Sequence, residues 1–220
     1  MTFYVFIIVL FAAFLHALWN AMVKNGSSTL LTTIIITMMG AIIAAVSLPF
    51  CKSPEAVCFI YIGISVVLQV LYFLLISYIY QRCDMGTAYP LMRGSAPLIT
   101  AIIGCAFLGE VLSVKAWIGI LFISGGIIST VFLKNKADHN KNWLALLNAV
   151  VIASYTIIDG IGVRLSFAPL AYILWIMLFQ GIILTGIQCI RDKKALLSYL
   201  RQYWHLGIIG GIGMMGSYGL

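Results

Sequence analysis

The sequence predicts an all-α fold: a polytopic membrane helical bundle with about eight transmembrane helices. Of its 220 residues, 63% are hydrophobic and only 9% are charged, whereas soluble domains carry roughly 25% charged residues. Such a composition cannot cover a water-facing surface with polar side chains, which excludes a soluble enzyme. Because a spanning helix takes about 20 residues, eight spans use roughly 160 and leave no room for a separate soluble domain.

Eight apolar segments follow one another along the chain, separated by short polar connectors. The first lacks the basic residues that begin a signal peptide and is long enough to span, so we interpret it as a transmembrane helix. The last has only about 16 apolar residues, which is barely enough to cross a bilayer. The segments lie at about 3–23, 30–50, 56–80, 85–108, 113–133, 143–165, 167–190 and 204–220.

Basic residues gather in the odd-numbered connectors. These hold Lys24, Arg82, Lys134, Lys136, Lys141, Arg191, Lys193, Lys194 and Arg201, whereas the even-numbered ones hold Lys52, Lys115 and Arg164. The positive-inside rule then places the odd connectors in the cytoplasm and the N-terminus outside. Since the bilayer explains the net charge of +7, we expect lipid and a small-molecule substrate as partners and no nucleic acid.

Internal similarity suggests two copies of one unit. Residues 16–26 align with 152–162, matching Ala17 with Ala153, Gly26 with Gly162, Trp19 with Tyr155 and Asn20 with Thr156. We therefore predict a first five-helix repeat at 1–133, a polar connector at 134–142 and a C-terminally incomplete second repeat at 143–220. Because five is odd, the two copies would lie in opposite orientations, as in inverted-repeat transporters.

Arg93, in the fourth segment, is the most prominent candidate for function. A central arginine costs roughly 2.5–3.5 kcal/mol on insertion scales and needs a partner or a water-filled cavity. Pro90 and Pro97 flank it, and each removes a backbone donor, which membrane helices tolerate where they line a cavity. Two interpretations stay open: a cavity wall that receives an anionic substrate, or a structural arginine paired across helices with Asp159. One stripe of this helix is polar apart from a small alanine: Tyr89, Arg93, Ala96 and Thr100.

Other polar residues lie on the first and third segments. His16 and Asn20 form an i, i+4 pair beside Trp19. The imidazole would suit a proton relay, but we favour an interhelical hydrogen bond. Gln69 suits either a cavity lining or a helix contact.

Two acidic residues lie toward the ends of apolar segments. Glu110 ends the fourth segment, where we expect it to organise the turn, and Asp159 follows Tyr155 by one turn in the sixth. Glycines of the fifth and eighth segments predict close helix packing. They are Gly119, Gly125, Gly126, Gly207, Gly210, Gly211, Gly213 and Gly216.

Motifs for catalysis and metal binding are missing from the sequence. It contains no HExxH, GxSxG or Walker motif. The five cysteines, at 51, 58, 83, 105 and 189, show no ligand spacing. We therefore predict that the protein is not an enzyme and has neither a metal site nor a cofactor.

Two strings resemble the EamA-type members of the drug/metabolite transporter superfamily. They are LHALWNAMVKNG and AYPLMRGSAPLITAIIGCAFLGEVLSVKAWIGILFISGGII. The resemblance implies ten helices in two inverted repeats around a central cavity, and secondary transport, often export of small metabolites. It also places Tyr89, Pro90, Arg93 and Pro97 in the most characteristic helix, with Glu110 at its end.

Two departures from the family pattern matter. Family members commonly keep both termini in the cytoplasm, unlike the charge count here, and this sequence stops inside its eighth segment. We therefore expect an incomplete version of the ten-helix inverted-repeat fold in the inner or plasma membrane.

The expected function is export of a small polar metabolite, such as an amino acid or another anionic compound. The alternative is a non-transporting membrane subunit or an inactive truncated remnant, and a homodimer is one way to complete a shared cavity. Residues expected to contact substrate or line its cavity are Arg93, Tyr89, Gln69, His16, Asn20, Trp19 and Tyr155. Pro90, Pro97, Glu110 and Asp159 are expected to serve the structure.

Overall fold

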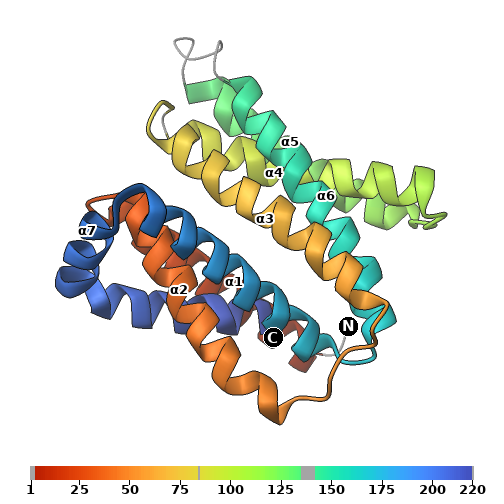
Figure 1. Cartoon of the computed structure of the whole chain (residues 1–220). Coiled ribbons are helices and arrows are strands. Elements are labelled where there is room, and N and C mark those ends of the chain that lie inside the picture. Colours follow the sequence, from red (N-terminus) through yellow and green to blue (C-terminus); the bar gives the residue numbers. More distant parts are fainter. Residues whose placement is uncertain (1–2, 84, 135–141, 220) are drawn as a thin grey trace. The chain divides into compact units, whose positions relative to one another are not determined.

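The computed structural model describes residues 3–83, 85–134 and 142–219, and every secondary-structure element in these ranges is helical (Figure 1). The prediction of an all-α polytopic bundle is confirmed, because six helices of the described residues are long and apolar enough to cross a membrane and a shorter apolar helix lies at Val114–Ser129. Most of the predicted connector at 134–142 lies outside the described residues. The helices are α1 (Phe3–Asn25), α2 (Thr29–Ser47), the 3-10 helix η1 (Leu48–Phe50), α3 (Cys58–Tyr80), α4 (Met85–Phe107), α5 (Val114–Lys134), α6 (Asn142–Ser166) and α7 (Pro169–Gly219).

The seventh and eighth predicted segments both lie in α7, which turns twice. The helix has 51 residues, which would extend for roughly 77 Å at 1.5 Å per residue, far beyond the ~30 Å hydrocarbon core. Its backbone leaves the helical region at Asp192 (φ −161°, ψ 85°) and at Tyr203 (φ −121°, ψ 22°). These breaks divide α7 into a first stretch, 169–191, a middle stretch, 193–202, and a last stretch, 204–219. The sequence predicted only a polar connector for the middle stretch.

The chain forms two compact units. The first contains the residues up to Val70 and from Gly162 onward, and the second contains Leu71–Ile161. Both α3 and α6 contribute residues to each unit. These units group residues that pack together and do not test whether the sequence contains two copies of one unit. The two predicted repeats, at 1–133 and 143–220, therefore stay a prediction.

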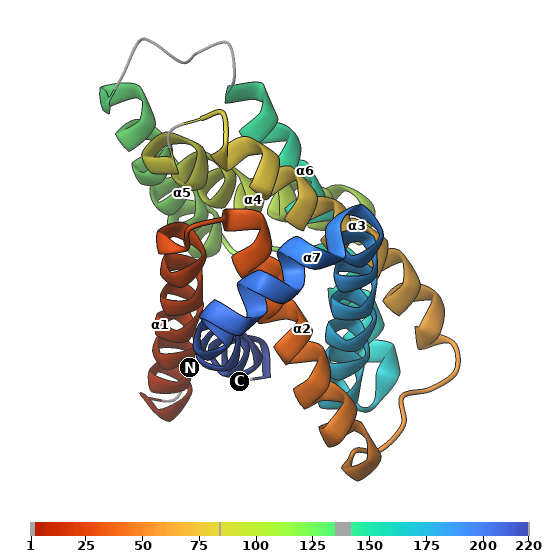
Figure 2. The same cartoon turned by 60° about the vertical axis from the view of Figure 1, so that its left-hand side comes forward.

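Glycines bring α7 close to its neighbours in the first unit. A Cβ added at Gly207 would lie 3.2 Å from the carbonyl oxygen of Ile35 in α2, and one at Gly216 would lie 2.7 Å from Leu15 Cδ1 in α1. Apolar burial drives little association inside a bilayer, so small residues that let backbones approach are what allow tight packing. The predicted role of the eighth-segment glycines is confirmed. Figure 2 shows the two outer stretches of α7 joined by the shorter one, which crosses the start of α2.

The second unit is built around α4. Gly94 faces α5, where an added Cβ would lie 2.8 Å from Ile127 Cγ2. Asn148 Nδ2 of α6 lies 3.0 Å from Met92 Sδ of α4. Helix α4 therefore packs against both α5 and α6.

The glycines of the fifth segment behave differently from those of the eighth. A Cβ added at Gly119, Gly125 or Gly126 would meet no atom of the described residues within 4 Å. The prediction of close packing at these three positions was wrong within this unit. The reason is that α5 contacts α4 through the side chain of Ile127, which lies next to Gly94, and these three glycines lie on other faces of α5.

Candidate functional site

Helix α4 carries two prolines without losing its helical path from Met85 to Phe107. Proline has no backbone N–H, so it cannot donate to the carbonyl four residues earlier. For Pro97 that carbonyl belongs to Arg93, and for Pro90 it belongs to Gly86. Helix α4 therefore lacks the internal hydrogen bond that the carbonyl of Arg93, its charged residue, would otherwise accept from residue 97.

A cavity of about 440 Å³ opens beside this part of α4, within the second unit. Arg93, Ala96, Pro97 and Thr100 supply one wall, and their spacing places them on a single face of the helix. The other walls come from α5, α6 and the turn after α4. All the lining residues are Arg93, Ala96, Pro97, Thr100, Ala101, Glu110, Leu112, Ile120, Ile152 and Thr156.

Tyr89 lies beside the arginine side chain. The guanidinium carbon of Arg93 is 5.8 Å from the centre of the Tyr89 ring, which is within the range of a cation–π interaction. The two residues are one turn apart, and long helical side chains lean toward the N-terminus, which brings Arg93 over the earlier ring. Tyr89 therefore contacts the guanidinium without lining the cavity itself.

Glu110 reaches the same cavity because the chain turns back after α4. Gly109 has a φ of +66°, a left-handed conformation that favours glycine. The N–H groups of Leu108 and Glu110 both donate to the carbonyl of Gly104, at 3.1 and 3.2 Å. The carboxylate then lies over the helix, so that a Cβ added at Gly104 would be 2.9 Å from Glu110 Oε2.

The cavity thus offers a cation, a carboxylate and two threonine hydroxyls on otherwise apolar walls. A guanidinium matches a carboxylate or phosphate through paired N–H donors. The carboxylate of Glu110 is suited to an ammonium group, and Thr100 and Thr156 add hydroxyls. Thr156 Oγ1 donates to the carbonyl of Ile152 at 2.7 Å, so its oxygen remains able to accept a hydrogen bond. Such a set of groups can hold a small molecule that carries charges of both signs.

Two further predicted residues belong to the second unit but lie outside this lining. Tyr155 is buried, with its ring centre 5.9 Å from that of Tyr72 in α3. Asp159 follows one turn later on α6 and is half-buried. The expected place of Tyr155 in the substrate cavity stays a prediction, and so does the expected structural role of Asp159.

His16, Trp19 and Asn20 lie together on α1 in the first unit. The His16 ring centre is 5.1 Å from that of Trp19 and 5.6 Å from that of Tyr218, at the end of α7. Asn20 Nδ2 donates to the carbonyl of His16 at 2.7 Å. The imidazole ring therefore contacts α7 as well as its own helix, and the interhelical hydrogen bond favoured from the sequence stays a prediction.

Gln69 also belongs to the first unit. Its Nε2 donates to Ser65 Oγ at 3.1 Å, one turn earlier on α3. Arg93 belongs to the second unit, whereas Gln69 and His16 belong to the first. That the three residues line one cavity stays a prediction.

Sequence reasoning missed some residues that take part in these sites. Thr156 lines the cavity, and the only signal was its alignment with Asn20 in the internal repeat. Tyr218 contacts His16, but no pattern linked the last segment to the first. Glu110 was expected at the turn, and its place in the cavity depends on the fold of that turn.

Comparison with known proteins gives one match. The model of the EamA-like transporter family matches residues 3–132, which is more than half of the chain. The matched region includes α1 to α4 and most of α5, and with them Arg93, both prolines of α4 and Glu110. No curated protein and no solved structure matches the chain.

Proposed function

The chain belongs to the EamA-like transporter family, and on this premise we propose that it moves a small polar metabolite across the cytoplasmic membrane by secondary transport. The proposed substrate is an amino acid or another anionic compound, and the proposed direction is export. The observation that carries the proposal is the cavity beside Pro97, where Arg93 and Glu110 both face the lining.

The chemistry of the lining supports a small charged substrate. Arg93 would bind the carboxylate of an amino acid through its N–H donors, and Glu110 would accept from the ammonium group. The cavity of about 440 Å³ lies within the roughly 300–1,000 Å³ that small-molecule sites occupy. A charge inside a membrane helix is costly, so its retention beside a cavity favours a role in substrate passage.

The test replaces Arg93 with alanine and with lysine in the full chain. Vesicles containing the wild type are loaded with radiolabelled amino acids and monocarboxylates, and the rate of release is measured for each compound. We expect R93A to lose at least tenfold in rate for carboxylate substrates and R93K to retain part of it, because lysine keeps the charge without the planar fork.

Arg164 provides the matched control, since its side chain is exposed near the end of α6. R164A removes the same charge and should leave release unchanged. Undiminished transport by R93A, with normal insertion, would remove Arg93 from the site. If the wild type moves none of the compounds, the alternative of a non-transporting membrane subunit is favoured.

A further inference from the structure

The middle stretch of α7 is a short helix with defined ends. Asp192 precedes it as an N-cap, and its Oδ1 accepts a hydrogen bond from the N–H of Ala195 at 2.9 Å. Gln188 Nε2 donates a hydrogen bond to the carbonyl of Asp192 at 3.3 Å. The stretch ends at Tyr203, where the backbone again leaves the helical region. The stretches on either side correspond to the seventh and eighth predicted spans, so we expect residues 193–202 to lie at the membrane interface.

The inner face of this stretch is anchored to the start of α2 and to the connector that precedes it. Leu196 and Tyr199 are buried. Tyr199 Oη lies 2.7 Å from Thr32 Oγ1 and accepts from Ser27 Oγ at 3.2 Å. These contacts fix the rotation of the stretch about its own axis.

With Tyr199 facing inward, the basic residues must face outward. At about 100° per residue, Leu197 and Arg201 lie roughly 160° from Tyr199, and Lys194 lies roughly 140° from it. All three are exposed. The outer face is therefore set by the buried tyrosine.

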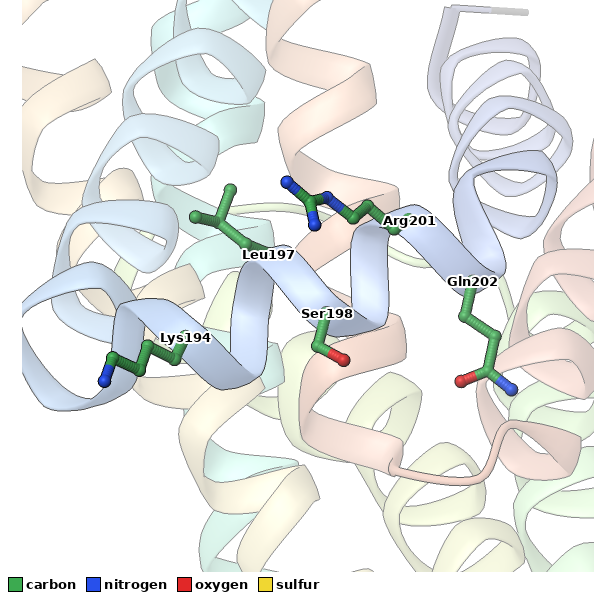
Figure 3. A pocket seen from close by; sticks show the side chains of 5 residues that line it. All are labelled: Lys194, Leu197, Ser198, Arg201 and Gln202. Atoms are coloured by element: carbon green, nitrogen blue, oxygen red, sulfur yellow. The ribbon is translucent and has the colours of Figure 1, made fainter.

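This outer face forms a shallow open hollow of about 520 Å³. Figure 3 shows its five side chains fanning out from one stretch of helix. Lys194 and Arg201 are two turns apart, or roughly 10 Å along the axis. Ser198 and Gln202 lie on the flank of this face, roughly 100° and 60° from Tyr199, and add neutral hydrogen-bonding groups beside the charges. The lining has no carboxylate, and its residues are Lys194, Leu197, Ser198, Arg201 and Gln202.

Apolar side chains are exposed next to these charges. Ile190 is 90% exposed, Leu197 is 45% exposed and Trp204 is 56% exposed. Large apolar groups beside lysine and arginine are typical of helices that lie in the membrane interface, where the ring or aliphatic chain enters the acyl boundary and the charge stays among the headgroups.

We propose that this outer face binds the headgroup of an anionic phospholipid. Arg201 contacts phosphate oxygens through its planar N–H donors, and Lys194 contacts them as a point charge. Leu197 and Trp204 lie against the acyl chains. The site is independent of the proposed transport cavity, because it shares none of the residues that line it.

The test uses the full chain in phosphatidylcholine vesicles that contain increasing fractions of dibrominated phosphatidylglycerol. Bromine quenches tryptophan fluorescence at short range. The chain has five tryptophans, so the difference in quenching between the wild type and W204F gives the contribution of Trp204. We expect dibrominated phosphatidylglycerol to quench Trp204 at lower fractions than dibrominated phosphatidylcholine does. The preference is the ratio of the phosphatidylcholine fraction to the phosphatidylglycerol fraction that gives the same quenching. It should fall about fivefold for each charge removed in K194Q and R201Q.

The double variant K52Q/K115Q is the matched control, because it removes two exposed charges outside α7, one after η1 and one in the first turn of α5. It should keep the preference, as should K194R/R201K. Equal quenching by the two lipids in the wild type, or an undiminished preference in K194Q/R201Q, would overturn the proposal. Loss of the preference on adding inorganic phosphate at constant ionic strength would also overturn it, by assigning the site to free phosphate.

Discussion

Replacing Tyr199 with phenylalanine tests the anchor that holds the middle stretch of α7. The Thr32 hydroxyl already donates to the carbonyl of Ser28 at 2.8 Å, so its single proton is committed. Tyr199 must therefore donate to Thr32 Oγ1 at 2.7 Å, while it accepts from Ser27 Oγ at 3.2 Å and from the Ser28 N–H at 3.4 Å. The phenol hydroxyl is the middle of a continuous chain of hydrogen bonds.

The cost of Y199F follows from these contacts. The short bond to Thr32 is between buried groups and contributes about 1 kcal/mol, and the two longer bonds add a few tenths each. Thr32 keeps its bond to Ser28, and the two donors that lose Tyr199 belong to the exposed Ser27 and the half-buried Ser28, where water can replace the acceptor. The total therefore stays at about 1–2 kcal/mol. For a chain of this size the midpoint of thermal unfolding should fall by roughly 3–6 °C.

The assay is thermal unfolding of the full chain in detergent, followed by circular dichroism. Tyr203 supplies the matched control: its ring centre is 4.5 Å from that of Tyr199, but its hydroxyl makes none of these bonds. Y203F should shift the midpoint by less than about 1 °C. Equal shifts for the two variants would refute the hydrogen-bond reasoning, since they differ only in which hydroxyl is lost.

Two further predictions concern glycines, and both are measured by the same unfolding assay. G181A should destabilise by about 1–3 kcal/mol, because its Cβ would lie 2.5 Å from the backbone oxygen of Thr37. G186A, on the same stretch with no atom within 4 Å, should instead stabilise by up to about 1 kcal/mol through helix propensity. A stabilised G181A would contradict the observed crossing of α2 and α7. G109A should cost about 1–2 kcal/mol because φ is +66° there. G119A, in an open helical position like Gly186, should stabilise by up to about 1 kcal/mol, and equal effects of G109A and G119A would contradict the left-handed turn.

The helical segments were predictable because hydropathy is a local property. The expected end of one span at residue 190 and the start of the next at 204 match the backbone breaks at Asp192 and Tyr203. The helical form of the connector between them was not expected. It is stabilised by the bond from Tyr199 to Thr32, which are 167 residues apart, and no local pattern records such a contact.

The cavity was predictable in part for the same reason. The spacing of Arg93 and Thr100 on one helix face follows from the helical period alone, and both line the cavity. Glu110 and Thr156 join them through the turn at Gly109 and through the packing of α6. Those positions depend on contacts between separate elements, which neither periodicity nor composition encodes.

The sequence by itself determined the membrane class, the positions of the spans and the family of this protein. These properties depend on side-chain hydrophobicity summed over about 20 neighbouring residues, and on motifs whose members lie close together in the chain. The tertiary structure alone decided that a glutamate joins Arg93 in one cavity, and that Lys194 and Arg201 lie on the side of their stretch opposite the buried Tyr199. Both depend on packing between distant segments: the fold-back at Gly109 brings the carboxylate to the cavity, and the buried hydroxyl of Tyr199 sets the direction of the basic face.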